Sequence, residues 1–296
     1  MTTIQQALQT AATKFSRTSH TASLDAEVLL SFVLKKPKTF LYTNPEKELT
    51  RSQRERFGRL VARRARRVPI AYLTNHKEFY GLDFFVDRRV LVPRPETELL
   101  VDVIIEQIAN GKSQMANREL TIADVGTGSG ALIITLAKLL PTICDSRFAI
   151  RYYGTDTSQP ALAVARKNAA AHRVNVTLLR GSLLAPLKGK RVDILVANLP
   201  YLTPAQYQKN RDLRFEPRSA LVAGRDGLEA YRHLFEHLER DGLDPRLIIC
   251  EIDPSQSRPI IALARHHFPA AHRLIKKDLT GKNRVLIIKK NKAQTQ

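Results

Sequence analysis

Two apolar runs in this chain each end in a loop of unusual composition, and together they constrain the fold more than any other feature. The run at 120–125 leads into a glycine-rich loop at 126–130, and the run at 193–197 leads into Asn198-Leu199-Pro200-Tyr201. Parallel strands of a doubly wound sheet release ligand-binding loops at their carboxyl ends, where neighbouring loops form a crevice. The two loops therefore predict an α/β fold with a ligand site at one edge of the sheet.

Strand-like and helix-like segments alternate from about residue 95 onward, which indicates βαβ units and a mainly parallel sheet. Near the end, strand-like segments at 272–279 and 283–290 flank Thr280-Gly281-Lys282, and so short a turn permits only antiparallel pairing. The other expected strands cover 120–125, 149–155, 175–180, 192–197 and 246–252, and the expected helices cover 97–109, 130–139, 160–171, 227–240 and 256–267.

The first 70 residues are expected to be helical, because apolar residues recur there at helical spacing, as at 4–17 and 23–35. Thr50 with Gln53 three residues later forms a capping box for an arginine-rich helix. The inward seam of this helix is expected to be Phe57, Leu60 and Val61, which leaves its arginines on the exposed faces.

Residues 78–86 and 90–92 are rich in aromatic and β-branched side chains and flank Asp87-Arg88-Arg89, a pattern typical of a β-hairpin. A chain of 296 residues is long enough for one large core and a smaller domain. The expected domains are a helical domain over 1–74, a β-hairpin linker over 75–95 and an α/β domain over 96–296.

Composition also indicates the compartment. No segment approaches the roughly 18 consecutive apolar residues of a membrane-spanning helix, and the first residues lack the layout of a secretory signal. Cys144 and Cys250 are far apart in the sequence, which argues against a structural disulfide and a cysteine-rich metal site. We expect a cytoplasmic monomer with no membrane association and no metal.

The net charge of +20 is concentrated in two stretches. Residues 51–67 hold eight arginines against Glu55, and residues 265–292 hold nine Lys or Arg against Asp278. Such stretches attract polyanions by releasing condensed counterions. The charge is consistent with a solvated basic surface and with contact to RNA or a ribosome-bound partner, and it does not choose between them.

The glycine-rich loop suits a cofactor, because glycines allow a tight turn and a close approach of ligand to backbone. The next helix presents free amide hydrogens to a carboxylate. NAD-binding loops usually read G-x-G-x-x-G, whereas this loop reads G-x-G-x-G. Asp156, after the next strand, can accept both hydroxyls of a ribose, or it can cap the following helix. The predicted cofactor-binding residues here are Gly126, Thr127, Gly128, Ser129, Gly130 and Asp156.

The Asn-x-Pro-Tyr loop suits a planar amide or amine. The side-chain carbonyl of Asn198 and the backbone carbonyl of Leu199 can hold both hydrogens of an amide nitrogen and aim its lone pair at a methyl donor, while Tyr201 can stack on the planar group. A sulfonium methyl is already electrophilic, so positioning carries the catalysis. With the glycine loop, this predicts methyl transfer from S-adenosylmethionine to nitrogen; the alternative is a plain proline-containing turn.

With these motifs the chain resembles the release-factor glutamine N(5)-methyltransferases (the HemK/PrmC family) over nearly its whole length. Pro93-Arg94-Pro95-Glu96-Thr97-Glu98 is more specific than the loops common to all such methyltransferases. The matching segments are 69–74, 91–98, the glycine loop, 198–201, Arg214-Phe215-Glu216-Pro217, 278–281 and 283–285.

The resemblance implies a class I S-adenosylmethionine-dependent methyltransferase domain with a seven-stranded sheet, preceded by a small helical domain that docks the substrate. It also implies methylation of the glutamine in the Gly-Gly-Gln loop of peptide chain release factors. The implied catalytic residues are Asn198, Leu199, Pro200 and Tyr201, and the implied cofactor contacts add Ser182, Leu183 and Asn198.

Two positions depart from the family pattern. Leu199 replaces a proline, yet its carbonyl survives and Pro200 still restricts it to extended conformations. Ser182 stands where an acidic residue is common; it can still hydrogen-bond, and Leu183 can pack on adenine.

Three other functions use the same features. They are glutamine methylation of a large-subunit ribosomal protein, N6-adenine methylation of nucleic acid, and non-catalytic binding of RNA or the ribosome. The segment 93–98 favours release factors, and no base-reading module is evident. His233 and His237 share a helix face without a third zinc ligand, Glu251 has no role that we can derive, and Arg218 and Arg225 either meet the substrate or are solvated.

Overall fold

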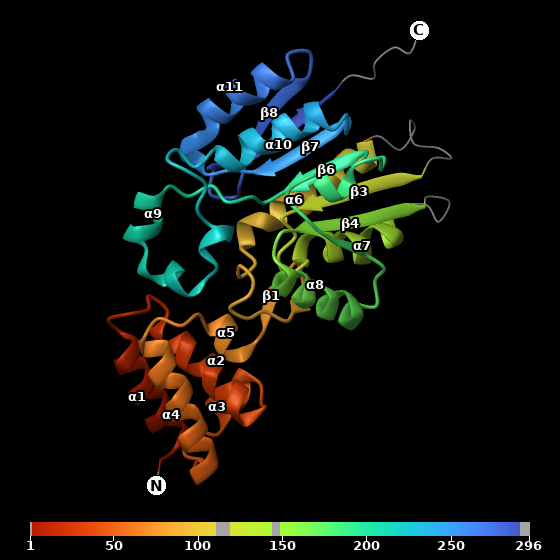
Figure 1. The fold of residues 1–296 in the computed structure, drawn as a ribbon. Coiled ribbons are helices and arrows are strands. Elements are labelled where there is room, and N and C mark those ends of the chain that lie inside the picture. Colours follow the sequence, from red (N-terminus) through yellow and green to blue (C-terminus); the bar gives the residue numbers. More distant parts are fainter. Residues whose placement is uncertain (1, 111–118, 144–148, 291–296) are drawn as a thin grey trace. The chain divides into compact units, whose positions relative to one another are not determined.

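The computed structural model describes residues 2–110, 119–143 and 149–290. Cys144 lies outside these ranges, and Cys250 is a buried free thiol. Within the described part of the chain, every helix is too short or too polar to cross a lipid bilayer. The chain forms two compact units, one of Met1–His76 with Asn210–Phe215 and one of Lys77–Lys209 with Glu216–Gln296 (Figure 1).

The first unit is a helical bundle with its own apolar core. The α1 helix begins at a capping box between Thr3 and Gln6, and α4 begins at the predicted box between Thr50 and Gln53. The predicted inward seam of α4 is confirmed, since Phe57, Leu60 and Val61 are buried. Its helices are α1 (Ile4–Phe15), α2 (Ala22–Leu34), α3 (Lys38–Thr43), α4 (Arg51–Ala65) and α5 (Ile70–Thr74).

The prediction that the arginines of α4 are all exposed is wrong. Nε of Arg64 lies 2.7 Å from Oδ2 of Asp25, and the two side chains are only 13% and 9% exposed. Asp25 on α2 is a buried acid, so an arginine turns inward to pair with it. Arg54 likewise donates to the carbonyl of Leu49 at 2.7 Å, and the guanidinium of Arg56 lies over the ring of Phe32.

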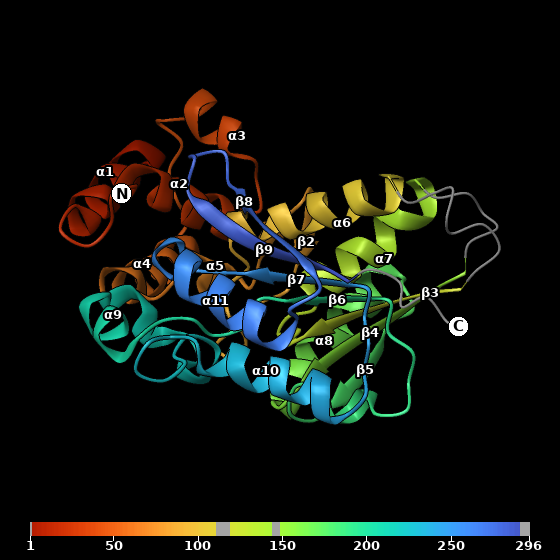
Figure 2. The same cartoon turned by 90° about the horizontal axis from the view of Figure 1, so that it is seen from above.

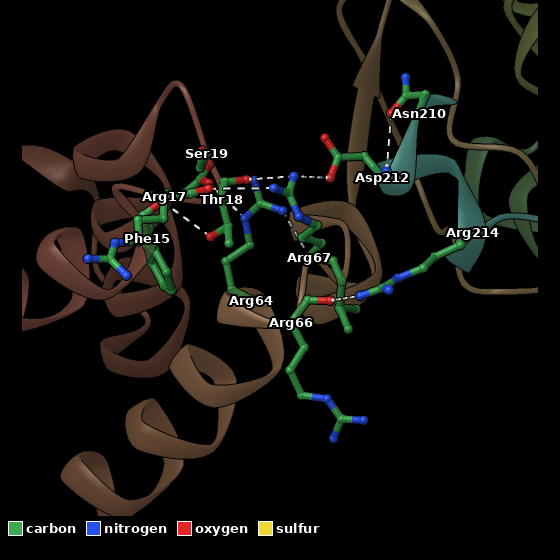
Figure 3. Close-up of polar contacts among 12 residues, drawn as sticks. Phe15, Arg17, Thr18, Ser19, Arg64, Arg66, Arg67, Asn210, Asp212 and Arg214 are labelled. Atoms are coloured by element: carbon green, nitrogen blue, oxygen red, sulfur yellow. Dashed lines mark hydrogen bonds and ion pairs between the residues drawn. The ribbon is translucent and has the colours of Figure 1, made fainter. Parts of the chain in front are cut away.

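A segment from much later in the chain completes this unit. The η4 segment (Arg211–Phe215) is held by Nη1 of Arg67, which lies 2.9 Å from Oδ1 of Asp212 (Figure 3). In addition, Nη2 of Arg214 donates to the carbonyl of Arg66 at 3.0 Å. Helical periodicity gives no signal for such contacts, because they join residues about 150 positions apart in sequence.

The second unit contains the predicted sheet of seven strands, in the order β5-β4-β3-β6-β7-β9-β8 (Figures 1 and 2). Strands β3 to β7 are parallel, and β9 pairs antiparallel with β8, as predicted. It also pairs antiparallel with β7, which the sequence did not predict. The strands are β3 (Leu120–Val125), β4 (Ile150–Asp156), β5 (Thr177–Arg180), β6 (Ile194–Ala197), β7 (Leu247–Glu251), β8 (His272–Lys277) and β9 (Asn283–Lys289).

Helices cover both faces of this sheet, so its central strands are apolar on both sides. On β6, Ile194 and Val196 pack into the core under α6 and α7, whereas Leu195 and Ala197 pack into the core under α10 and α11 (Figure 2). The helices are α6 (Glu98–Asn110), α7 (Ala131–Ile143), α8 (Gln159–His172), α9 (Pro204–Lys209), α10 (Glu229–Arg240) and α11 (Ser257–His267).

The predicted hairpin is wrong in the position of its turn. The paired strands are β1 (Lys77–Phe79) and β2 (Leu82–Phe84), joined by Tyr80 and Gly81 with φ of 53° and 73°. Two consecutive residues of positive φ make the two-residue turn that matches the twist of a hairpin. At the expected turn, the Asp87 carboxylate instead accepts the N–H of Arg89 at 3.0 Å, and this local turn joins no paired strands.

Candidate active site

A cavity of about 310 Å³ lies in the second unit, where the loops after β3, β4, β5 and β6 meet. This is the switch edge at which open α/β sheets bind ligands. A smaller cavity of about 60 Å³ adjoins it and shares Gly126, Gly128 and Asn198 with it. Of the predicted site residues, Gly126, Gly128, Asp156, Ser182, Leu183, Asn198, Leu199 and Pro200 line the larger cavity, and Thr127 and Ser129 line the smaller one.

The glycines of the loop have different surroundings. Gly128 has a φ of 55°, and a methyl group added there would meet no atom closer than a backbone oxygen at 4.0 Å. This side of Gly128 is therefore open, and a ligand can approach the backbone closely. Gly130 has a φ of 78°, and an added methyl would lie 2.7 Å from Cδ1 of Ile134. Gly130 thus serves the packing of α7, and it lines neither cavity.

The carboxylate of Asp156 ties the glycine loop to the end of β4. Its Oδ2 accepts the N–H of Gly128 at 2.9 Å, and its Oδ1 accepts the N–H of Ser158 at 2.8 Å. Burial raises the pKa of Asp156, and these N–H groups oppose the rise. The alternative that Asp156 caps α8 is wrong, because Ser158 is the cap and its Oγ accepts the N–H of Ala161.

Asp124, the last acidic residue before the glycine loop, is buried under the same site. Its Oδ2 accepts the hydroxyl of Thr127 at 2.6 Å, and the residue is 3% exposed. Burial raises the pKa of Asp124 to about 7, although the Thr127 hydroxyl opposes the rise. Its carboxyl therefore changes charge near neutral pH beside the smaller cavity.

Asn198 is held in one orientation by Thr97. Its Nδ2 donates to Oγ1 of Thr97 at 2.9 Å, and that hydroxyl donates to Oε2 of Glu251 at 2.6 Å. Among the described residues, none donates to Oδ1 of Asn198, so this oxygen is free to accept from a ligand in the cavity. The hydroxyl of Tyr231 lies 3.4 Å from the neighbouring carbonyl of Leu199, but its single hydrogen goes to the nearer carbonyl of Glu251, so the Leu199 oxygen keeps its lone pairs.

Tyr201 points its hydroxyl at the same carboxylate, donating to Oε1 of Glu251 at 3.0 Å. It lines neither cavity. Glu251 is completely buried, and its backbone carbonyl accepts the hydroxyl of Tyr231. Sequence reasoning gave Glu251 no role. The available signal was its place at the end of the apolar strand β7, where acidic side chains reach the edge of a parallel sheet.

An ion pair joins two of the motif segments that matched the family. Nη2 of Arg94 lies 2.6 Å from Oε1 of Glu216, and Oε2 of Glu216 accepts the N–H of Val92 at 3.0 Å. The Glu216 side chain is 4% exposed. The pair fixes the start of the 93–98 segment against the chain that returns from the Asn198 loop.

His233 lines the larger cavity, whereas Arg225 does not, and Arg218 lies over the ring of Tyr207. Burial lowers the pKa of His237. Across the described residues, no cluster of three or more His, Cys, Asp or Glu side chains is placed to hold a metal ion.

Comparison with known proteins identifies the family of the chain. Residues 6–74 match the family described as PrmC N-terminal domain, and residues 89–244 match the family described as N-6 DNA Methylase. The hMettl16 catalytic domain in complex with MAT2A 3'UTR hairpin 1 aligns with 89% of this chain and 91% of its own, with a TM-score of 0.55 and 13% identity. The second unit thus has the class I methyltransferase fold.

Relatives with curated names identify the family to which the chain belongs. The release factor glutamine methyltransferase of Moorella thermoacetica is 40% identical over 270 residues, which are 89% of this chain and 90% of that protein. The protein of the same name from Coxiella burnetii is 33% identical over 293 residues, which are 98% and 100% of the two chains. The chain belongs to the release factor glutamine methyltransferase family.

Proposed function

We propose that this protein transfers a methyl group from S-adenosylmethionine to the side-chain amide nitrogen of the glutamine in the Gly-Gly-Gln motif of peptide chain release factors. The observation that carries the proposal is that Asn198 and Leu199 line the cavity, and that Oδ1 of Asn198 accepts from none of the described residues. The two residues lie beside a glycine loop whose backbone is open to a ligand at Gly128. The names of the curated relatives support release factors as the substrate.

The residues of the cavity fit the methyl donor. Asp156 offers a carboxylate for the ribose hydroxyls, Leu183 an apolar side chain for adenine, and Gly128 an unobstructed backbone for the methionine part. Serine at 182 offers a hydrogen-bonding hydroxyl there. S-adenosylmethionine, when bound, supplies a sulfonium methyl, which is a strong electrophile. The remaining work of the protein is to hold the acceptor nitrogen in line with it.

In this reaction the two acceptors take the two amide hydrogens of glutamine. The lone pair of the nitrogen lies perpendicular to the plane of these two hydrogens, which leaves a face of the amide open to the methyl donor. Gly128, Asp156 and Leu183 would hold the donor, which would supply an electrophilic methyl group to this nitrogen in exchange for one of its two protons. Tyr201 supplies an aromatic ring whose hydroxyl is fixed on Glu251, and stacking of this ring on the glutamine amide stays a prediction.

The first unit is proposed to dock the release factor through the exposed arginines of α4. Arg59, Arg63 and Arg66 are exposed, whereas Arg64 and Arg67 are engaged with Asp25 and Asp212. A test of docking must therefore leave Arg64 and Arg67 intact, because changing them would disturb the bundle itself. Contact of the same helix with RNA is a competing outcome of that test.

Mass spectrometry of a purified release factor, incubated with the protein and S-adenosylmethionine, tests the activity. A gain of one methyl group on the glutamine of the Gly-Gly-Gln peptide is expected, and none on a factor with alanine in its place. Asn198→Ala should abolish most turnover and leave cofactor affinity within about tenfold. Asp156→Ala should instead weaken cofactor binding measured by calorimetry. Methylation of ribosomal protein or adenine, with no methylation of the factor, would overturn the proposal.

The docking proposal is tested with the triple variant Arg59→Glu/Arg63→Glu/Arg66→Glu. Its control carries the same charge change on exposed residues of the second unit, Arg258→Glu/Arg265→Glu/Lys277→Glu. The docking variant alone should weaken binding to the release factor and flatten its salt dependence, because fewer counterions are released. Equal loss in both variants, or equal loss for ribosomal RNA, would mean general attraction of polyanions.

A further inference from the structure

We propose that Thr97 and Glu251 are positioning residues that set the polarity of the Asn198 side chain, so that its carbonyl oxygen and not its NH₂ group faces the substrate amide. The inference rests on the proposed function and adds to it two residues, from η1 (Pro95–Thr97) and from the end of β7, that act through a third.

The fold brings these residues together at the edge of the sheet. Ala197 on β6 is in register with Cys250 on β7, so the next residues, Asn198 and Glu251, leave adjacent parallel strands at the same level. Thr97 lies between their side chains, with its hydroxyl 2.9 Å from Nδ2 of Asn198 and 2.6 Å from Oε2 of Glu251. Thr97 is 7% exposed and Glu251 is fully buried, so water does not compete for these bonds.

The direction of the hydrogen bonds follows from the chemistry of the groups. Both carboxyl oxygens of Glu251 accept a hydroxyl, one from Thr97 and one from Tyr201, so the single hydroxyl hydrogen of Thr97 points to Glu251. Towards Asn198 the threonine oxygen then offers only a lone pair. Asn198 must therefore present its NH₂ group to Thr97 and its Oδ1 to the opposite side. Without this constraint an asparagine amide can turn by half a rotation, which exchanges an acceptor for a donor.

The same carboxylate is supported on its other oxygen. Tyr201 donates to Oε1 at 3.0 Å, so each oxygen of Glu251 receives a hydroxyl hydrogen. Burial raises the pKa of Glu251, and the hydroxyls of Thr97 and Tyr201 and the charge of Arg284 oppose the rise, whereas Glu96 adds to it. A substrate amide needs acceptors for both of its hydrogens, and an Asn198 turned the wrong way would place a donor against them.

A matched pair of variants tests the role of Thr97. Thr97→Val keeps the shape and removes the hydroxyl, whereas Thr97→Ser keeps the hydroxyl. We expect kcat for the release factor to fall by about tenfold or more in Thr97→Val and by no more than about threefold in Thr97→Ser. The KM for the release factor and the calorimetric affinity for S-adenosylmethionine should stay within about threefold of wild type in both, because neither depends on the Asn198 amide alone.

A double-mutant cycle separates positioning from simple loss of structure. If Thr97 acts through Asn198, then adding Thr97→Val to Asn198→Ala should lower kcat by less than about twofold further. Glu251→Gln should reduce kcat in the same direction, since a side-chain amide can donate to Thr97 and release the threonine hydrogen towards Asn198. Thermal melting checks that each variant is folded.

Full turnover in folded Thr97→Val, or additive effects of the two substitutions, would overturn the inference. Failure of the proposed function is distinguishable from failure of this inference, because in that case the wild-type protein itself leaves the release factor unmethylated. If Thr97→Val does not fold, the comparison of Thr97→Ser with Glu251→Gln still decides. Wild-type turnover in folded Glu251→Gln would refute the role of the carboxylate.

Discussion

Asp124 should make the free energy of unfolding depend on pH in a way that one substitution isolates. Its carboxyl is 3% exposed and receives one side-chain hydrogen bond, from Thr127. Burial disfavours the charged form, and it raises the pKa of Asp124 from 3.8 to about 7. Asp124→Asn replaces the carboxyl with a neutral group of the same shape, so it resembles the protonated acid at every pH.

The linkage between protonation and folding gives the sign and the size of this pH dependence of stability. A carboxyl with a raised folded pKa favours folding fully below its unfolded pKa, and this contribution is lost as the pH rises towards the folded pKa. The difference between 3.8 and about 7 corresponds to about 4 kcal/mol at about 1.4 kcal/mol for each pH unit. Between pH 5 and pH 8, about 2.5 kcal/mol of this is lost in the wild type and none of it in Asp124→Asn.

Urea denaturation of both proteins at pH 5, 6, 7 and 8, without cofactor, measures the effect. The difference between their unfolding free energies isolates Asp124 together with its coupling to the charge of Asp156, which also raises the pKa of Asp124. Thr127→Val, which removes the hydrogen bond that stabilises the charged form, should steepen the loss in the protein that keeps Asp124. Parallel stability curves for the wild type and Asp124→Asn across this range would refute the reasoning.

Three further outcomes are expected. Gly128→Ala should cost only about 1 kcal/mol of stability for its positive φ, yet lower the affinity for S-adenosylmethionine by about tenfold or more, because the new methyl group borders the cavity. Gly130→Ala should lower the melting temperature more than Gly128→Ala, because its methyl group would meet Ile134; equal melting temperatures would contradict this. Glu216→Gln should destabilise the protein by about 2 kcal/mol in urea denaturation, since Arg94 loses its buried partner, and a change below about 0.5 kcal/mol would speak against that role.

Most strands and helices of the second unit were predictable, because the sequence patterns that indicate them lie within the elements themselves. The run at 120–125 is mostly apolar and leads into glycines, and this suffices to identify a buried parallel strand with a ligand loop. The hairpin was misplaced because Tyr80-Gly81 is not a common turn pair, whereas Asp87 followed by two arginines looks like one. The turn position depends on the positive φ at Tyr80, which propensity does not predict.

The site was predictable only in part. The residues lining the cavity follow strand ends, and so their neighbourhood can be inferred from the sheet. The links from Asn198 through Thr97 to Glu251 join positions 101 and 154 residues apart. Nothing in the spacing of the sequence encodes such distant partners. The prediction that all arginines of α4 are exposed was wrong for the same reason, since the inward turn of Arg64 depends on Asp25, a buried acid on another helix.

The return of residues 210–215 to the first unit has a consequence for how the protein is made. Arg67 leaves the ribosome long before its partner Asp212, which follows 145 residues later. At roughly 5 to 20 residues per second, synthesis of that stretch takes roughly 7 to 30 s. During that interval the Arg67 guanidinium can bond to the carbonyls of Arg17 and Thr18 but lacks its acidic partner, while β3 to β6 emerge behind it. The amino-terminal unit is thus among the first parts to be synthesised and cannot be finished until most of the sheet has followed it.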